Sequence, residues 1–253
     1  MDTLACVKRV PDTGAKIVLT DDNQSIDTSN LGFTMSPHEE CALEEAIQIA
    51  EETGGETTAL TLGPPEADEQ LRTALAMEAD EAVLLETDGD EWGPQDTAAA
   101  IAAHVESSDA EYDLLLFGNE AADTANHQVP IHVAERLDLP AVTSIKSLDV
   151  ADGTAVARRE VPGGEEVYEL PLPAVITVKE GLNEPRYPSI RSKMQARKKP
   201  VEEVQPERAG LDQLEMVELE APEREEGAAE ILGEGPEAVD EIVRVMREEV
   251  EVL

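Results

Sequence analysis

The sequence predicts an α/β fold built on a doubly wound, mainly parallel β-sheet. Short apolar segments alternate with segments of helical length and pattern as far as residue 148, and turn residues separate them. Residues 114–117, Leu-Leu-Leu-Phe, are continuously apolar, as in a strand that is covered on both faces. Strand and helix alternating in this way are typical of parallel strands joined by helical crossovers.

The expected elements follow one another in regular order. The predicted strands are 4–10, 57–62, 82–85, 112–117 and 142–148, and the predicted helices are 37–53, 69–77, 96–105 and 128–137. The first helix carries the clearest start signal, because Ser36 precedes Pro37 and Glu39 completes a capping box. Gly54 marks its end. The preceding residues 12–35 are polar and rich in turn signals.

The pattern changes after the fifth predicted strand. Segments 154–161 and 166–170 flank Pro-Gly-Gly and predict a β-hairpin within 154–172, and 174–178 predicts a further strand. Up to residue 185 we therefore expect one α/β domain that includes this hairpin.

The charge of the chain reverses at residue 186. Segment 186–199 contains six basic residues and no acid, and we expect it to form a loop. The arm that follows, 200–253, contains 18 acids and only 4 arginines, and helical periodicity returns only over 238–252. The arm has too few apolar residues to fold as a domain, so we expect it to lie against another chain.

The whole chain is strongly acidic, with 57 Asp and Glu against 19 Lys and Arg and a formal net charge of −38. The acids are interleaved with patterned apolar segments, which argues against a disordered acidic chain. Dense carboxylates with only 7 lysines suit a protein that stays soluble in molar salt, where the Debye length is about 3 Å. We expect adaptation to high salt and no nucleic-acid partner.

No segment predicts export, membrane insertion or a metal site. The start lacks the basic and apolar regions of a signal peptide, and no apolar run approaches the roughly 20 residues that span a bilayer. Cys6 and Cys41 form no CxxC pattern, and the four histidines are not at metal-ligand spacing. We expect a cytoplasmic protein with reduced thiols.

A ligand is expected at the carboxyl ends of the parallel strands. Segments 6–8, 61–64 and 118–130 could line one crevice there. The last is a polar loop that runs into a predicted helix N-terminus, where free N–H groups and the helix dipole favour a phosphate; a capped helix without a ligand is an equal alternative. No GxxxxGK[ST], GxSxG or HExxH motif occurs, so the sequence indicates binding without evident catalysis.

Several motifs in collinear order over residues 1–200 resemble the beta subunits of electron-transfer flavoproteins. They are Cys-Val-Lys-Arg-Val-Pro-Asp at 6–12, Met-Ser-Pro-His-Glu-Glu at 35–40, Leu-Arg-Thr-Ala-Leu-Ala-Met at 71–77, Leu-Pro-Ala-Val-Ile-Thr at 172–177, Leu-Asn-Glu-Pro-Arg-Tyr at 182–187 and Met-Gln-Ala-Arg-Lys-Lys at 194–199. Their succession is far more specific than any single motif. The chain is therefore identified as a member of this family.

The resemblance implies a fold of the adenine-nucleotide-binding, Rossmann-like type and an electron-carrier subunit with no catalytic residues of its own. In the family an alpha subunit holds the redox FAD, and the beta subunit holds AMP or, in the bifurcating Fix-type branch, a second FAD. The nucleotide-binding residues implied by position are Cys6, Ser36, Pro37, His38, Glu39, Leu62, Gly63, Asp123, Thr124, Ala125, Asn126, His127, Gln128, Val129, Pro130, Val133 and Ala134.

The resemblance also implies partners. The basic segment corresponds to a partner-recognition loop with Ile190 as its key apolar residue, and the arm 200–253 would embrace the alpha subunit. The recognition residues implied by position are Pro188, Ser189, Ile190, Arg191, Lys193 and Met194. Electrons would come from acyl-CoA-type dehydrogenases and pass to a membrane quinone oxidoreductase.

Two other functions are alternatives to this family, and two loop residues differ from its common pattern. A stand-alone ATP-binding regulatory module would need a Gly-x-x-Gly loop, and an ATP-pyrophosphatase a Ser-Gly-Gly-x-Asp-Ser loop, neither of which occurs. Within the family, a simple carrier is favoured over a bifurcating subunit. The chain has Ala125 where the family often has Asp, and Pro130 removes an N–H group, which leaves the identity of the bound nucleotide open.

Overall fold

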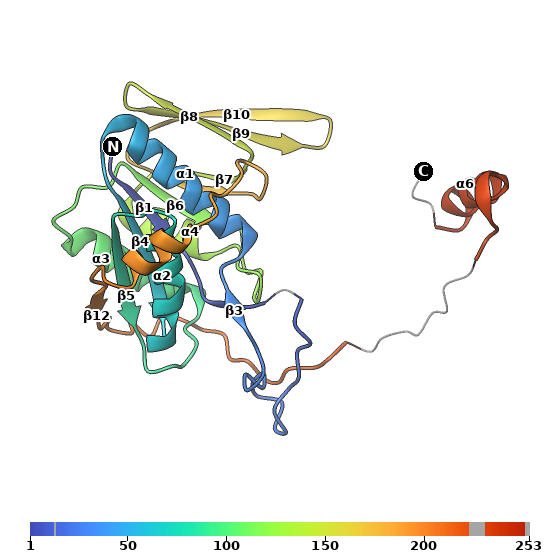
Figure 1. The fold of residues 1–253 in the computed structure, drawn as a ribbon, viewed down its shortest axis with the longest axis horizontal. Coiled ribbons are helices and arrows are strands. Elements are labelled where there is room, and N and C mark those ends of the chain that lie inside the picture. The colour runs from blue at the N-terminus through green and yellow to red at the C-terminus, as the bar shows by residue number, and fades with distance from the viewer. Residues whose placement is uncertain (13, 223–230, 251–253) are drawn as a thin grey trace.

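The computed structural model describes residues 1–12, 14–222 and 231–250, and its centre is a seven-stranded sheet (Figure 1). The strand order is β12-β5-β4-β1-β6-β11-β7, and every neighbouring pair is parallel. The strands are β1 (Thr3–Cys6), β4 (Thr57–Gly63), β5 (Glu81–Glu86), β6 (Leu114–Gly118), β7 (Ala141–Ile145), β11 (Ala174–Val178) and β12 (Glu202–Val204). The predicted doubly wound, mainly parallel α/β fold is confirmed.

Helices cover both faces of this sheet. One face packs against α1 (Pro37–Thr53) and α2 (Asp68–Ala76), and the other against α3 (Pro94–Ser107) and α4 (Val129–Leu137). The side chains of β6 alternate between the two layers: Leu114 and Leu116 join the α1 side, whereas Leu115 and Phe117 join the α3 side. The continuous apolar run of β6 thus reflects burial on both faces.

The start of α1 follows the capping signals. The Ser36 hydroxyl accepts a hydrogen bond from the Glu39 N–H at 3.4 Å, and the Glu39 carboxylate accepts one from the Ser36 N–H at 3.1 Å. Pro37 occupies the first turn, where no N–H is needed. Gly54 ends the helix in the left-handed conformation, with φ 76°. These features fix the N-terminus of α1 at the carboxyl end of the sheet.

The predicted strand 142–148 is wrong, because two strands share these residues. Strand β7 ends at Ile145, and β8 (Ser147–Ala151) belongs to a separate antiparallel sheet with β9 (Thr154–Val161) and β10 (Gly164–Pro171). Ser144 adopts φ 62°, and its N–H donates to the Thr177 hydroxyl at 2.8 Å, where the register against β11 shifts. This irregularity redirects the chain, and the predicted hairpin gains a third strand.

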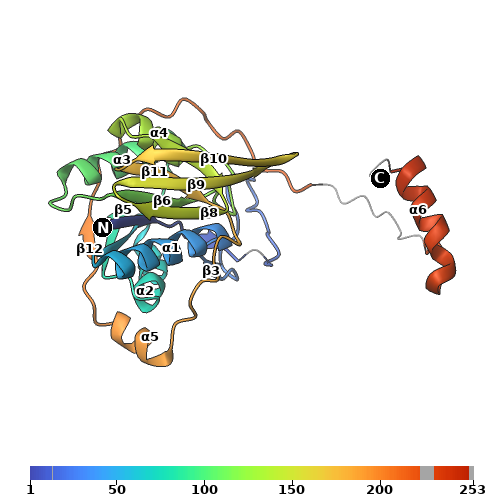
Figure 2. The same cartoon turned by 90° about the horizontal axis from the view of Figure 1, so that it is seen from above.

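Segment 186–199 differs from the predicted loop, because it contains a short helix, α5 (Ile190–Ala196). The Ser189 hydroxyl caps this helix by accepting a hydrogen bond from the Ser192 N–H at 3.0 Å. Figure 2 shows α5 beside α2, where Ala196 is buried. Seven residues are too few for the helical period to stand out in a sequence.

The acidic arm begins as part of the central sheet. Strand β12 pairs with β5 at the edge of the sheet, and the chain then crosses the start of α3, where Arg208 pairs with buried Asp96 at 3.2 Å. Further on, the Leu219 N–H donates to the Asn23 carbonyl at 2.9 Å.

The end of the arm is helical, as predicted. The helix α6 (Val239–Glu248) follows a single turn, η2 (Gly235–Ala238), while residues 251 and 252 of the predicted helical stretch lie outside the described part. None of the described helices combines the length and apolar character needed to cross a membrane.

Candidate functional site

The candidate site lies where the winding of the sheet changes direction. From β1 the chain proceeds to β4 and β5 on one side, and then returns to β6 on the other side of β1. The carboxyl ends of β1 and β6 carry Cys6 and Gly118, which lie on adjacent strands. Such a change of direction is the usual place for a ligand in an open parallel sheet. The predicted site residues around Cys6 and 118–130 therefore meet at one edge.

The N-terminus of α1 closes one side of this site. Glu39 is only 5% exposed, and a side chain at position 118 would place its Cβ 2.6 Å from Cγ of Glu39. Only glycine fits at this contact. The Ser36 hydroxyl also donates to the Glu120 carbonyl at 3.4 Å, which ties α1 to the loop that follows β6.

Glu120 lies between two of the predicted histidines. Its carboxylate is 2.7 Å from Nε2 of His127 and 3.6 Å from Nε2 of His38. Nδ1 of His127 lies 2.9 Å from the Asn119 carbonyl oxygen, and neither that carbonyl nor the carboxylate can donate. Nδ1 of His127 also lies 3.4 Å from the side-chain amide nitrogen of Asn119, so the ring is held between the Glu120 carboxylate and Asn119.

The His38 ring is held differently. Its Nδ1 accepts a hydrogen bond from the Glu180 N–H at 2.7 Å, so its hydrogen lies on Nε2, facing Glu120. Sequence reasoning did not select Glu120 as a site residue, although it belongs to the polar loop 118–130. The signal that could have found it is the pair of histidines that the fold brings to its two oxygens.

Lys8 supplies a positive charge at the site. Its ammonium lies 2.7 Å from Asp123 and 2.9 Å from Glu91. Burial alone would lower the pKa of Lys8, but the two carboxylates outweigh this effect and raise it. Lys8 therefore stays charged and ties the start of the β1 loop to the loop after β6.

The remaining predicted residues divide into an apolar wall and an exposed loop. Five of them lie in or against the apolar cluster between the sheet and α4: Cys6, Leu62, Val129, Val133 and Ala134. Residues 123–128 are exposed, and both Ala125 and His127 adopt positive φ, 48° and 54°. Gly63 instead accepts the Thr87 N–H with its carbonyl, on the β5 side of the site.

The end of the loop, where it enters α4, presents backbone N–H groups that have no hydrogen-bond acceptor among the described residues. Within the described part of the chain, no group accepts a hydrogen bond from the N–H groups of residues 126–129, and Pro130 has none to give. A hollow of about 340 Å³ lies beside the loop, lined by Asn119, His127, Ile131, Thr143, Ser144 and Thr177. Free amides, a histidine ring and an apolar wall together suit the phosphate and the base of a nucleotide. His127 is the only predicted site residue on this hollow.

No group of three or more His, Cys, Asp or Glu side chains that could hold a metal ion occurs in the residues the structure describes. The candidate site offers hydrogen-bond donors, charged groups and apolar contacts. None of these contacts by itself names the ligand.

Comparison with known proteins names the family. A family model described as "Electron transfer flavoprotein domain" matches residues 25–209. The chain is also 38% identical, over 259 residues and the full length of both chains, to electron transfer flavoprotein subunit beta of Bacillus subtilis (strain 168). The chain belongs to the beta-subunit family of electron transfer flavoproteins.

Other members of this flavoprotein family are similar over most of their length. Electron transfer flavoprotein subunit beta of Dictyostelium discoideum is 31% identical, with 96% of each chain covered. The caffeyl-CoA reductase-Etf complex subunit CarD of Acetobacterium woodii is 35% identical over 206 residues, or 79% of this chain and 77% of CarD. The predicted family is thus confirmed, and with it an association with flavin.

Buried Glu39 gives this flavoprotein subunit a pH-dependent stability. Burial raises the pKa of Glu39 to about 8, although N–H groups of Ser36 and Lys8 oppose the shift. The folded state therefore holds a proton between the ordinary carboxyl pKa and about 8, where the unfolded state has released it. Stability from this group is present at low pH and is lost as the pH rises through that window, at up to about 1.4 kcal/mol per pH unit.

We expect Glu39→Gln to remove this dependence. An amide cannot ionise, but its oxygen still accepts the Ser36 N–H and preserves the cap. The free energy of unfolding, measured from pH 5.5 to 8.5 in molar salt, should fall more steeply for the wild type than for the variant. Exposed Glu135→Gln serves as the matched control and should follow the wild type. Parallel curves for Glu39→Gln and the wild type would show that Glu39 does not ionise in this window.

Proposed function

We propose that the chain is the beta subunit of a heterodimeric electron-transfer flavoprotein that takes electrons from acyl-CoA-type dehydrogenases and passes them to a membrane quinone oxidoreductase. The observation that carries the proposal is the loop 119–128, which presents free N–H groups and His127 at the strand ends in a member of a flavoprotein family. No nucleophile paired with a base is part of this arrangement. Binding, rather than catalysis by side chains, is the function that it supports.

We propose AMP as the nucleotide held by this subunit. The N–H groups of 126–129 and the ring of His127 would hold its phosphate, and the wall formed by Cys6 and Leu62 would receive its base. The redox chemistry would come from FAD held mainly by the alpha subunit. This chain would then contribute binding and orientation, with AMP as a structural ligand.

A bifurcating subunit with a second FAD is the alternative that a specific observation supports. The chain is similar to CarD, which is named as part of a caffeyl-CoA reductase-Etf complex. The loop also departs from the common family pattern: Ala125 removes a carboxylate, and Pro130 removes an N–H group that could contact a phosphate. The number of flavins bound by the complex separates the two proposals.

The surface of the basic segment suits a protein partner. Ile190 is 82% exposed and Met194 is 61% exposed, so two large apolar side chains face solvent on α5. The Lys193 ammonium lies 4.8 Å from the centre of the Tyr187 ring, and Arg191 follows Ile190. An apolar anchor within a basic surface is suited to an acidic partner with an apolar pocket. We propose that dehydrogenases dock here.

The arm 200–253 supplies the proposed contact with the alpha subunit. Its helix α6 buries none of its residues against the rest of the described chain, yet Val239 and Ile242 form part of an apolar stripe. An amphipathic helix with a bare apolar face requires a partner surface. We propose that the alpha subunit provides that surface.

Co-expression with the cognate alpha subunit tests this assignment. The two chains should co-purify in high salt as a yellow heterodimer. The chain expressed alone should be poorly stable because the apolar face of α6 then lacks its partner surface, and nearly free of flavin because the alpha subunit would hold most of the FAD. A stable, monodisperse monomer that binds flavin by itself would overturn the proposal.

A further inference from the structure

The helix α5 carries the proposed docking surface, but the helix is short and has few buried contacts to hold it in place. It has only seven residues, a length at which an isolated helix is not stable in water. All seven are described, and Ala196 alone among them is buried. A hollow of about 380 Å³ lies beneath the segment, between Ser192 and Gln195 on α5 and Ile47 and Leu75 on α1 and α2. The position of α5 therefore depends on how its two ends are attached.

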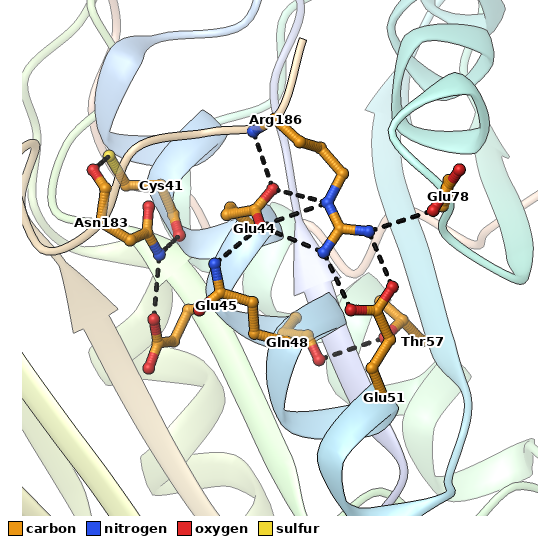
Figure 3. A network of polar contacts seen from close by, with 10 residues as sticks. Cys41, Glu44, Glu45, Gln48, Glu51, Thr57, Glu78, Asn183 and Arg186 are labelled. Carbon is orange, nitrogen blue, oxygen red and sulfur yellow. Dashed lines mark hydrogen bonds and ion pairs between the residues drawn. The ribbon is translucent and has the colours of Figure 1, made fainter. Parts of the chain in front are cut away.

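Arg186 attaches the leading end to the body of the protein (Figure 3). Its guanidinium forms a two-pronged pair with Glu44, at 3.0 and 3.1 Å, and a second with Glu51, at 2.7 and 3.0 Å. Glu78 accepts a further bond at 3.2 Å, and the Arg186 N–H donates to Glu44 at 2.9 Å. Gln48 holds the Glu44 carboxylate in place at 2.7 Å. One side chain thus joins α5 to α1 and to the turn before β5.

Residues 180–186 form a segment along α1, here called the strap, and Arg186 is its last residue. At the start of the strap, the Glu180 N–H donates to His38 at 2.7 Å. In its middle, the Asn183 amide donates to the Cys41 carbonyl at 3.0 Å and to Glu45 at 2.9 Å. The strap therefore follows α1 from the candidate nucleotide site to the docking helix, and Arg186 is its last contact before α5.

A second attachment holds the trailing end. Arg72 of α2 donates to the carbonyl of Ala196 at 2.9 Å and to the carbonyl of Lys199. The Lys199 ammonium donates to the Ala79 carbonyl at 2.8 Å. With this end fixed, the leading end sets the direction in which the exposed face of α5 points.

We propose that Arg186 is a positioning residue for partner recognition: by bridging Glu44, Glu51 and Glu78 it holds α5 over the hollow and fixes the direction of Ile190. The inference rests on the proposed docking function of α5. Planar guanidinium groups suit such two-pronged pairing, which a lysine ammonium cannot reproduce.

The Arg186 bridge also suits high salt. Glu44 is only 3% exposed, and salt screens a buried pair much less than an exposed one. The hydrogen bonds from Arg186 hold the pKa of Glu51 below its usual range, so this carboxylate stays charged over a wide range of pH. The bridge therefore persists under conditions that weaken ordinary surface ion pairs.

The experiment compares variants of the purified heterodimer in molar salt. Arg186→Met should speed amide hydrogen exchange over residues 187–199 and raise the dehydrogenase concentration at half-saturation about tenfold, the size expected when Ile190 no longer reaches its pocket on the partner. The maximal rate and the flavin content should not change. Arg186→Lys should restore the half-saturation only in part. Exposed Arg136→Met, which removes the same charge from α4, should match the wild type in every measurement.

Two further variants keep the test decisive. Arg186→Met leaves the buried Glu44 charge unpaired and should therefore lower the melting temperature. Adding Glu44→Gln removes this charge, so the double variant should regain the melting temperature but still need the higher dehydrogenase concentration for half-saturation. Arg186→Met added to Ile190→Ala should weaken docking no further than Ile190→Ala alone, because both act through one contact.

Unchanged amide exchange over 187–199 in Arg186→Met would overturn the positioning role. The same holds if the effects of Arg186→Met and Ile190→Ala on docking simply add. If Ile190→Ala alone leaves electron transfer unchanged, the docking function itself is wrong, while the exchange measurement still decides whether Arg186 holds α5.

Discussion

Lowering the salt concentration from about 1 M to about 0.1 M is expected to unfold the protein or separate it from its partner, because the Debye length then grows from about 3 Å to about 10 Å. At a net charge of −38, carboxylates that molar salt screens from one another would then repel across the whole surface. The ion pairs described above involve few cations, so they offset only a small part of this repulsion. The melting temperature, measured at fixed protein concentration over this range of salt, should fall steeply.

A charge variant separates screening from other effects of salt. Glu106, Glu111 and Glu135 are exposed near α3 and α4 and form no ion pair with any described residue. Changing all three to glutamine should raise the melting temperature in low salt and change it little in molar salt. A melting temperature of the wild type that stays constant from low to molar salt would contradict adaptation to high salt.

Ile190→Ala is expected to weaken docking of a dehydrogenase by roughly 1–3 kcal/mol, the usual range for losing a buried aliphatic anchor. The side chain is 82% exposed in this chain, so truncating it removes no internal contact of importance. In molar salt the surrounding charges contribute little to steering, so the apolar contact supplies most of the binding free energy. Electron transfer from a purified acyl-CoA dehydrogenase should therefore require about tenfold or more dehydrogenase for half-saturation.

The neighbouring charges provide the comparison for this variant. Replacing Arg191 and Lys193 with methionine should cost less than Ile190→Ala at high salt and more at the lowest salt that the complex tolerates. Flavin content and melting temperature should stay at the wild-type values throughout. Wild-type rate and half-saturation for flavin-loaded Ile190→Ala would show that α5 is not the docking surface.

The central fold could be predicted from the sequence because its signals are local. The capping box of Ser36 and Glu39 and the apolar run 114–117 each determine structure through near neighbours or through burial on both faces. The same applies to the loop 118–130, whose place at a strand end follows from the alternation of strand and helix. The individual nucleotide-binding residues come instead from the family resemblance, and their role stays a prediction.

The features that could not be predicted depend on distant contacts. The break at Ser144 follows from a hydrogen bond to Thr177, 33 positions away. Strand β12 forms only because it finds the free edge of β5, and its three residues carry no pattern of their own. In the sequence Arg186 is one of six basic residues in a charged segment, and only the fold brings Glu44 and Glu51 to its guanidinium.

The cofactor content of the purified heterodimer tests the central claim most directly. The complex would be purified in high salt and denatured, and the FAD and AMP released would be quantified per heterodimer. We expect one FAD and one AMP per heterodimer. The alpha subunit separated from this chain should contain no AMP. Two FAD and no AMP would instead assign a second flavin to this chain, and the absence of any adenine nucleotide besides one FAD would contradict the nucleotide site at the ends of β1 and β6.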